Sequence, residues 1–414
     1  MFLKRLSIFF IIFLLTNCTD KENPIGINEG PQPIETTISD TSFFGNFFSY
    51  QDSLKSYNSS NKIIVGNYDD IEVKSLIKFQ NLPDTLNSLT DEFFKLTLVN
   101  KDSLNFSRQL KFGKILQPWK ENFVTWKAAT DSTDWETEFF TEIDFQFDVA
   151  TWQDSTIINI PYEYFYTENE EQLIVDNEVA ENGFIIFCEE NDNNGYVEFF
   201  SKDSDSKPYL SFDYTIADSD SIFSYNENLK EDAILYEKID GNNTEFPKYE
   251  DTLMIKNIPP VKIYMNLDLS FQNLIDKLND IDSEDDLRRM TVNKAELILY
   301  KAEEEQFEKR TLFSLRPYVL TNESATTPFN YFEDYDYLSY SNDSFIDSSE
   351  DKYNIDITNI IQQVLAGEID FNGLIFRSTN EGYDFEFIKF ANKYSDVDLQ
   401  PKLRIIYTPP FLDE

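Results

Sequence analysis

The stretch KPYLSFDYT, residues 207–215, has the pattern of a half-buried β-strand. Its apolar side chains Leu210, Phe212 and Tyr214 share one face, because successive side chains of a strand point to opposite faces. The proline near its start interrupts no hydrogen-bond ladder there. A second stretch, QPKLRIIYT at 400–408, repeats this design. The sequence therefore predicts two strands of similar construction, one late in each half of the chain.

Three further pairs of segments match in the same order in the two halves. Asn-Gly pairs at 182–183 and 372–373 mark turns, because both residue types tolerate positive φ, and an apolar strand follows each of them. The other matches are INIP (158–161) with IDIT (355–358), and VKSLIKF (73–79) with VKIYMNL (261–267). Four matches in order predict two related modules, residues 37–217 and 226–412, which meet where Asp, Ser and Asn cluster.

Both modules consist mostly of short apolar or alternating runs separated by Asn, Asp, Ser and Gly. This habit is typical of antiparallel β-sandwiches. Despite the high charge, a hydrophobic content of 41% and an aromatic content of 16% are enough for packed cores. Helical patterns are few, the best at 271–278 and 357–365. We therefore predict an all-β protein of two tandem antiparallel β-sandwich modules, jelly-roll-like, with minor helices.

The start of the chain, MFLKRLSIFFIIFLLTNC, has the order of a secretory signal peptide. Two basic residues precede an uncharged run, 6–15, that is too short for the roughly 20 residues of a membrane-spanning helix. LTNC at 15–18 is similar to a bacterial lipobox, whose cysteine is acylated after cleavage, although Asn17 replaces the usual small residue. We expect a lipoprotein signal peptide at 1–17, lipidation of Cys18 and a flexible tether at 18–36. The alternative is an ordinary secretory signal with a chance cysteine.

The segment after Cys18, TDKEN, bears on where the protein resides. It is polar and partly acidic, similar to the tags that send lipoproteins to the cell surface in some Gram-negative bacteria. We therefore expect an outer-membrane lipoprotein of the cell envelope that is exposed at the surface.

Charge and missing residue types exclude several functions. The chain has 35 Lys and Arg against 76 Asp and Glu; without positions 1–17 its formal charge is −43, from 33 basic and 76 acidic residues. Such a chain repels nucleic acid and anionic lipid. It has no histidine, and beyond Cys18 its one thiol is Cys188, in an apolar run; this removes histidine-dependent catalysis and the standard zinc sites. Carboxylate side chains alone could still catalyse glycoside hydrolysis or a lyase reaction. We expect a protein that is not an enzyme.

Further motifs of the first module are SLIKF before Leu82-Pro83, PWKENFVTW at 118–126, and Trp135. With the Asn-Gly turn and the strand at 207–215, they resemble in order and spacing the DNRLRE-type module of bacterial and archaeal surface proteins. The second half keeps KAELILY at 294–300 and PKL at 401–403 but has no tryptophan, so it resembles a divergent copy. The resemblance implies a β-sandwich of jelly-roll kind and, in some relatives, binding of acidic or neutral polysaccharide.

All four tryptophans lie in one part of the first module. Their flat faces could stack on sugar rings, or they could fill the sandwich core. We expect Trp126, in an alternating pattern, to be core, and both interpretations stay open for the other three. Lys120 and Glu121 could contact sugar hydroxyls. The candidate carbohydrate site therefore comprises Trp119, Trp135, Trp152, Lys120 and Glu121, and a neutral glycan, or a polyanion bridged by metal, suits an acidic module best.

Two Asn- and Asp-rich loops offer oxygen ligands of the kind that calcium prefers. Asp192 and Asn194 lie in one loop, and Asp203 and Asp205 in the other. Neither completes an EF-hand, and such residues also favour turns for conformational reasons. Structural calcium and plain turn chemistry are the two interpretations.

The sequence thus predicts a lipid-anchored, non-catalytic envelope protein that binds polysaccharide through its first module. The alternative is a structural spacer or an assembly component that contacts other envelope proteins without binding glycan. The clustered tryptophans favour binding; the acidity, the missing site chemistry and the divergent second copy favour the spacer.

Overall fold

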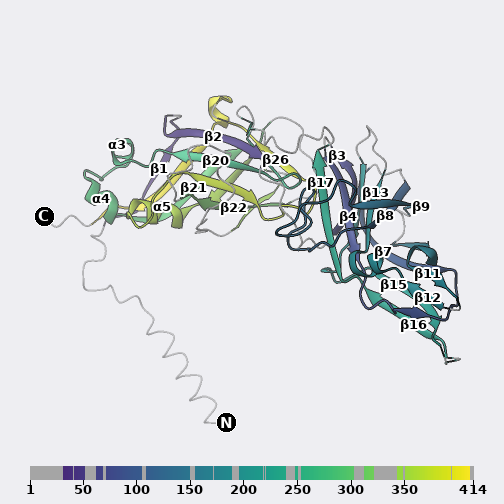
Figure 1. The fold of residues 1–414 in the computed structure, drawn as a ribbon. Helices are drawn as coiled ribbons and strands as arrows, with labels where there is room; N and C mark the ends of the chain where they lie inside the picture. Colours follow the sequence, from purple (N-terminus) through teal and green to yellow (C-terminus); the bar gives the residue numbers. More distant parts are fainter. Residues whose placement is uncertain are drawn as a thin grey trace, which may run out of the picture.

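The computed structural model of the chain consists mainly of antiparallel β-sheets (Figure 1). It describes residues 31–40, 42–51, 62–68, 71–104, 109–149, 154–170, 172–188, 195–217, 219, 221–238, 248–249, 253–302, 312–320, 343–347, 350–392 and 394–410. Within these residues there are four short α-helices and two 3-10 turns. The predicted all-β, sandwich-like fold is confirmed.

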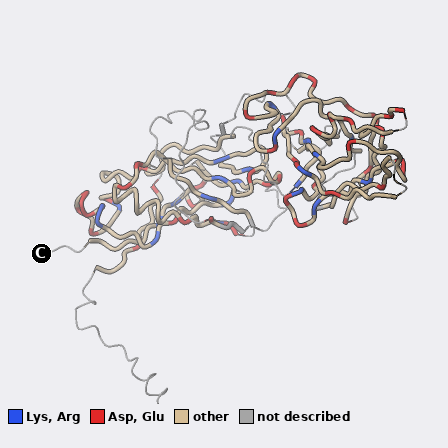
Figure 2. The backbone as a smooth tube through the Cα atoms, turned by 60° about the horizontal axis from the view of Figure 1, so that its bottom comes forward, with Lys and Arg blue, Asp and Glu red and all other residues tan. Residues whose placement is uncertain are grey.

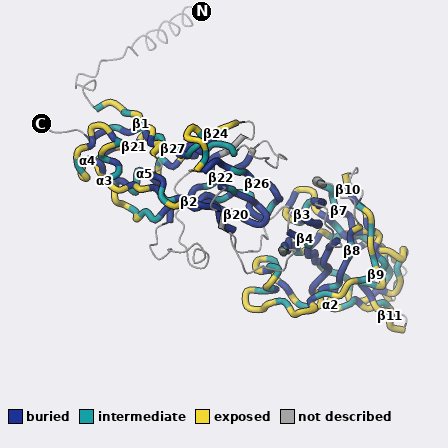
Figure 3. Tube along the Cα trace, turned by 90° about the horizontal axis from the view of Figure 1, so that it is seen from above, coloured by how far each residue is buried: buried dark blue, intermediate teal, exposed yellow. Residues whose placement is uncertain are grey.

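The described chain forms two lobes, one inserted in the other. Residues 62–238 form the inserted lobe, and residues 34–51 together with 248–408 form the split lobe. Figures 1 and 3 show the lobes end to end, with strand β1 at one end of the molecule and strand β11 at the other. Acidic residues are spread over both lobes (Figure 2).

The inserted lobe contains a twelve-stranded sheet and a three-stranded sheet. The large sheet runs β16-β15-β7-β14-β3-β4-β13-β8-β9, with β10, β17 and β6 paired to β7, β4 and β15; the small sheet runs β11-β12-β5. The strands are β3 (Lys62–Tyr68), β4 (Ile71–Lys78), β5 (Thr85–Leu86), β6 (Ser88–Leu89), β7 (Phe93–Leu104), β8 (Gln109–Ile115), β9 (Phe140–Asp148), β10 (Ser155–Pro161), β11 (Tyr166–Asn169), β12 (Gln172–Val175), β13 (Phe184–Cys188), β14 (Gly195–Phe200), β15 (Tyr209–Thr215), β16 (Phe223–Asn228) and β17 (Glu231–Lys238).

Aromatic side chains fill the core of the inserted lobe. The rings of Phe94 and Phe212 stack with centroids 3.9 Å apart, and Cys188 is buried in the same cluster. The 3-10 turn η2 (Tyr162–Tyr164) and helix α2 (Asn177–Asn182) connect strands here. Gly183 ends α2 at a φ of 75°, where a Cβ would lie 2.0 Å from the Ile77 carbonyl oxygen. The predicted Asn-Gly turn therefore requires its glycine.

The split lobe is formed by two sheets around one core. The first runs β1-β27-β21-β24; the second runs β18-β2-β20-β25-β22-β23, with β19 paired to β20 and to β26. The strands are β1 (Ile34–Ile38), β2 (Phe44–Gln51), β18 (Lys248–Tyr249), β19 (Leu253–Lys256), β20 (Val261–Leu267), β21 (Thr291–Tyr300), β22 (Leu312–Val319), β23 (Ser344–Asp347), β24 (Lys352–Asp356), β25 (Leu374–Ser378), β26 (Phe387–Phe390) and β27 (Lys402–Thr408).

Short helices sit beside these sheets. They are α3 (Phe271–Leu274), α4 (Glu284–Arg289), α5 (Thr358–Leu365) and the 3-10 turn η4 (Val397–Leu399). Helices α3 and α5 fall where the sequence predicted helices. Helix α5 contributes Ile360, Ile361 and Leu365 to a core that also holds residues of both sheets, including Leu297 and Phe376. The lobe is therefore sandwich-like, with α5 as one of its core-forming elements.

The lobes meet through a buried junction. Ile258 and Phe385 of the split lobe join a cluster of inserted-lobe residues that includes Tyr196, whose ring centroid lies 4.7 Å from that of Phe385. The ammonium of Lys62 lies 3.0 Å from a Glu198 carboxylate oxygen and 3.8 Å from one of Asp384 across the junction. Apolar burial therefore holds the lobes together, and Lys62 adds one charged contact, to Asp384, across the junction.

The predicted module boundaries are wrong. Strands β1 and β2, expected in or next to the first module, pair with β27 and β20 of the second half. Strand β17, expected in the second module, pairs along its whole length with β4 of the first. A repeated pattern in the sequence marks where similar strands recur, but strand pairing is non-local, so the pattern does not say which sheet each neighbouring segment joins.

Candidate functional site

The tryptophan loop, residues 116–139 between β8 and β9, lies on the outer face of the large sheet of the inserted lobe. Trp119 is only 3% exposed and packs in a cluster with Leu76 and Leu235. Its indole N–H donates to the Asn182 carbonyl oxygen at 2.7 Å, and the Lys78 ammonium lies 4.6 Å from its ring centroid. Of the two interpretations left open for Trp119, the structure therefore supports core packing, because the buried ring covers the sheet.

The other tryptophans are partly accessible or outside the description. The Trp135 ring stacks on Phe139 at 4.3 Å, and its indole N–H donates to the Thr125 carbonyl oxygen at 2.7 Å. Trp126, expected in the core, is half-buried against the same cluster, with the Lys74 ammonium 4.5 Å from its ring centroid. Trp152 lies outside the described residues. Trp135 is therefore the one described tryptophan of the predicted site with a partly exposed ring.

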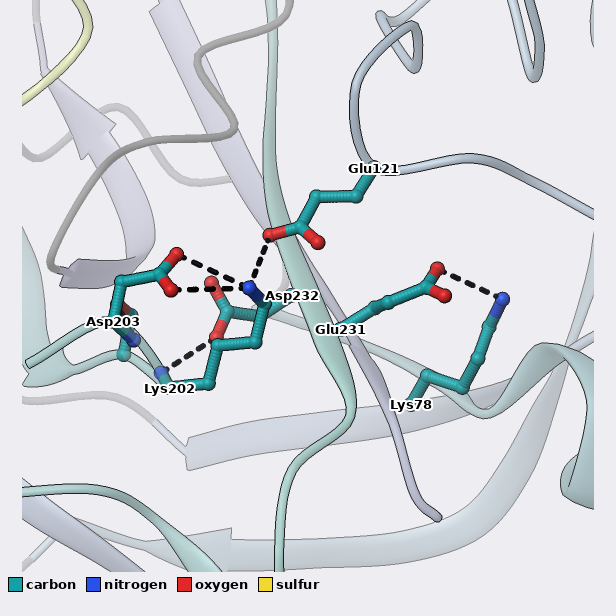
Figure 4. A network of polar contacts seen from close by, with 7 residues as sticks. Lys78, Glu121, Lys202, Asp203, Glu231 and Asp232 are labelled. Carbon is teal, nitrogen blue, oxygen red and sulfur yellow. Dashed lines mark hydrogen bonds and ion pairs between the residues drawn. The ribbon is translucent and has the colours of Figure 1, made fainter.

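A polar network ties the tryptophan loop to strand β17 (Figure 4). The Lys202 ammonium lies 3.0 Å from a Glu121 oxygen and 3.1 Å from an Asp203 oxygen, and the Lys202 backbone N–H donates to Asp232 at 2.7 Å. Beside it, Lys78 pairs with Glu231 at 3.1 Å. The Glu121 carboxylate thus already has a charged partner inside the protein, which makes it a poor sugar ligand.

Burial changes the proton affinity of this network. Burial raises the pKa of Asp232 to about 7, against the opposing hydrogen bond from Lys202. Burial also raises the pKa of Glu121, although the Lys202 hydrogen bond lowers it in part. For Lys202, burial lowers the pKa, but hydrogen bonds to Glu121 and Asp203 outweigh burial and the net shift is upward. Asp232 is therefore a carboxyl group that titrates near neutral pH.

The remaining predicted site residues are dispersed. Lys120 is exposed, with its ammonium 3.6 Å from Asp131. Asp203 is turned toward Lys202, and Asp205 is exposed nearby. Among the described residues, no group of three or more acidic or cysteine side chains is placed to hold a metal ion. Asp192 and Asn194 lie outside the described residues, so structural calcium stays a prediction.

An open groove of about 540 Å³ lies at the end of the inserted lobe where β6, β11 and β12 meet. Figure 1 shows β11 and β12 at the end of the molecule opposite to β1. We call it the tip groove; its lining residues are Asn87, Leu89, Thr90, Asp91, Glu92, Tyr162, Glu168, Glu170, Gln172 and Leu173. The two leucines are partly buried against the core, so the groove has an apolar base and a polar rim.

Hydrogen bonds organise the groove rim. The Tyr162 hydroxyl donates to Glu168 at 2.8 Å, and this bond raises the pKa of the tyrosine. Asp91 pairs with Lys95 at 3.1 Å outside the lining. The lining itself contains four carboxylates, two amides and neither Lys nor Arg. Such a rim presents many hydrogen-bond acceptors and a negative potential.

Sequence reasoning did not find the tip groove. Its residues come from two short segments, 87–92 and 162–173, that hold no recognisable motif. The segments meet because β12 pairs with β5 and because the Tyr162 backbone N–H donates to the Glu92 carbonyl oxygen. The nearest signal in the sequence is the density of carboxylates in YTENEEQ, residues 166–172, which an acidic chain makes unremarkable.

No family model and no curated protein matches the chain. The resemblance to DNRLRE-type modules therefore stays a prediction. In the part of the chain that the structure describes, no helix is long and apolar enough to cross a membrane.

Proposed function

We propose that this is a non-catalytic, lipid-anchored envelope protein that binds a neutral polysaccharide in the tip groove. The observation that carries the proposal is the groove itself, a concave site with a leucine base, a tyrosine ring and convergent amide and carboxylate groups. Sugar hydroxyls donate hydrogen bonds to such acceptors, and the apolar faces of sugar rings pack on tyrosine and leucine.

Charge narrows the ligand class. Asp91, Glu92, Glu168 and Glu170 line the groove, and no cation lines it with them. An anionic polysaccharide would be repelled at this rim unless a metal ion bridged it. An uncharged glycan is not repelled by these carboxylates, so it is the ligand that we infer.

The position of the groove suits surface display. It lies at the end of the molecule far from β1 (Figures 1 and 3), and the tether expected from Cys18 leads into β1. A lipid at Cys18 would therefore hold the split lobe nearer the membrane and point the groove away from it. Labelling cells with a clickable palmitate analogue tests the anchor: wild type should carry the label, and label that persists in Cys18→Ala contradicts it.

The test of the groove is a glycan array, followed by affinity electrophoresis in gels that contain the best polysaccharide. Tyr162→Ala combined with Glu168→Gln should weaken retention about ten-fold or more, which is roughly 1.4 kcal/mol of binding free energy. The Glu168 side chain is exposed, whereas Tyr162 packs partly against the core, so the melting temperature should fall only moderately, and retention is compared at a temperature at which the variant is folded. The matched control is Tyr394→Ala, which removes a tyrosine that is 73% exposed on the split lobe and should bind as wild type.

Two outcomes would contradict the groove. Full retention by the double variant would place the glycan elsewhere. Loss of retention in Trp135→Ala, with retention of the groove variant unchanged, would indicate that the glycan binds at the tryptophan loop. A wild-type protein with no affinity for any glycan, with and without calcium, would favour the alternative function.

That alternative is a structural or assembly component of a surface complex. One observation favours it specifically: the N-terminal segment 34–51 completes sheets that otherwise belong to residues 248–408. A segment of this kind can hold an assembly together if it pairs with a neighbouring molecule.

A further inference from the structure

The two lobes share one strand arrangement. In each, nine strands follow in the same chain order and pair in the same way with one exception. Strand β14 pairs with β7, whereas β26 reaches the end of β21 only through an isolated bridge between Phe390 and Lys301. In the inserted lobe they are β3, β4, β7, β8, β9, β10, β13, β14 and β15; in the split lobe they are β19, β20, β21, β22, β23, β24, β25, β26 and β27. For example, β4 lies between β3 and β13 as β20 lies between β19 and β25, and β7 pairs with β10 and β15 as β21 pairs with β24 and β27. We call each set of nine strands a body.

Each body is completed by two more strands, which we call its completing pair. In the inserted lobe β16 pairs with β15 and β17 pairs with β4. In the split lobe β1 pairs with β27 and β2 pairs with β20, which are the equivalent positions. The first completing pair directly follows its body in the chain. The second comes from the opposite end of the sequence.

The second completing pair is deeply buried in its body. Ile38, Phe43, Phe44 and Phe47 are at most 5% exposed and belong to the core of the split lobe. Phe48 and Tyr50 point to the other face of β2 and pack in a separate cluster with Tyr264 and Ile375. Without residues 34–51, the second body would expose this apolar surface and the unpaired edges of β27 and β20, which is a strong template for another strand.

We propose that residues 34–51 are a donor segment, and that the cleft they fill on β27 and β20 also accepts the same segment of a second copy of this chain. A second copy presents the same side chains in the same register, so every contact of the closed monomer can form between molecules. Each chain would then give its donor segment to one neighbour and receive another's, which builds a head-to-tail chain. The inference does not depend on glycan binding.

The test uses two single-cysteine forms of the full chain, with Cys18 and Cys188 replaced by Ser in both. One carries Thr37→Cys on β1 and the other Arg404→Cys on β27, because these residues lie directly opposite each other. The forms are mixed, unfolded in denaturant, refolded together at high concentration and oxidised. A disulfide between positions 37 and 404 of different molecules can then form in register only if the donor segment has crossed between copies.

The matched control is the equivalent place in the inserted lobe. Asp213 on β15 lies opposite Ser224 on β16, so Asp213→Cys and Ser224→Cys are mixed and treated identically. Because β16 follows β15 after a short connection, this pair should stay within one chain. We expect the 37–404 pair to give at least about ten times more crosslinked dimer than the control pair.

A third form carries both Thr37→Cys and Arg404→Cys in one chain and checks that the variants fold. At low concentration it should close an internal disulfide. If it does so while the mixed forms give no more dimer than the control, the segment is a fixed part of the monomer and the proposal is overturned. Failure of the internal disulfide would overturn the strand pairing on which the proposal stands.

Discussion

The two completing pairs occupy equivalent places but are built from different residues. On β17 the buried Asp232 lies opposite Ile77 of β4, whereas on β2 Phe47 lies opposite Met265 of β20. The β17 position is polar and tied to Lys202, and the β2 position is part of an apolar core.

Connectivity accounts for this difference. The pair β16–β17 begins eight positions after β15 ends, so little chain entropy opposes its docking. Strand β17 also buries Ile234, Leu235 and Tyr236, but the pair tolerates a buried carboxylate and includes ion pairs such as Glu231 with Lys78. The pair β1–β2 must return from the other end of the sequence, and its affinity for β27 and β20 rests on phenylalanine burial. A segment that docks from the far end of the sequence needs this apolar burial more than β16–β17, which directly follows its body.

The largest expected effect comes from weakening the donor segment. Phe47→Ala should lower the free energy of unfolding by about 3–5 kcal/mol, because it opens a cavity in the core of the split lobe. Chemical denaturation monitored by tryptophan fluorescence and by circular dichroism measures it. The control is Phe223→Ala on β16, a ring that is 38% exposed, which should cost less than about 1 kcal/mol. Equal losses in the two variants would contradict the unequal roles of the pairs.

The next effect concerns the buried carboxylate of β17. Its folded pKa of about 7 lies above its ordinary value of 3.8, so between these pH values the folded protein holds a proton that the unfolded chain has released. The stability contributed by protonated Asp232 is therefore fully present below about pH 4 and is lost as pH rises through 7. Asp232→Asn keeps an acceptor for Lys202 and removes this dependence.

We expect Asp232→Asn to be more stable than wild type by on the order of 2 kcal/mol at pH 8, and equal to it near pH 4. Urea titrations at pH 4, 6 and 8 measure the difference. Lys202, Glu121 and Asp203 face the Asp232 carboxyl group. A matched Asp203→Asn series therefore measures how much Asp203 contributes to the pH dependence. A difference between Asp232→Asn and wild type that does not vary with pH would contradict the assignment.

Many of the strands and turns could be predicted from the sequence. Two-residue alternation in KPYLSFDYT and QPKLRIIYT predicted β15 and β27, and the Asn-Gly pairs predicted the turns before β13 and β25, because these signals are local. The boundaries of the modules could not be predicted from the sequence. Segment 34–51 pairs with β27 and β20, whose residues lie more than 200 positions away, and its phenylalanines give no information about which edge they will cover.

The candidate site was less predictable than the fold. Clustered tryptophans indicated sugar binding, but Trp119 covers the outer face of a sheet whose inner face already packs in the core. A sheet whose second face is covered by a loop needs large apolar side chains in that loop. The sequence alone does not distinguish tryptophans that cover a sheet from tryptophans that bind sugar. The tip groove arises from packing of the small sheet, and no spacing in the sequence encodes it.

The smallest expected effect tests how the completing pair β16–β17 is fixed to its body. The Tyr225 hydroxyl on β16 donates to the Gln80 carbonyl oxygen, and burial raises the pKa of this tyrosine. Tyr225→Phe keeps the ring and removes the bond, so the free energy of unfolding should fall by about 1 kcal/mol. Tyr209→Phe on the neighbouring β15 is the control, since its hydroxyl has no hydrogen-bond partner among the described residues. A loss as large as that in Phe47→Ala would mean that β16–β17 stabilises its lobe as much as the donor segment does, and the contrast between the two completing pairs would fail.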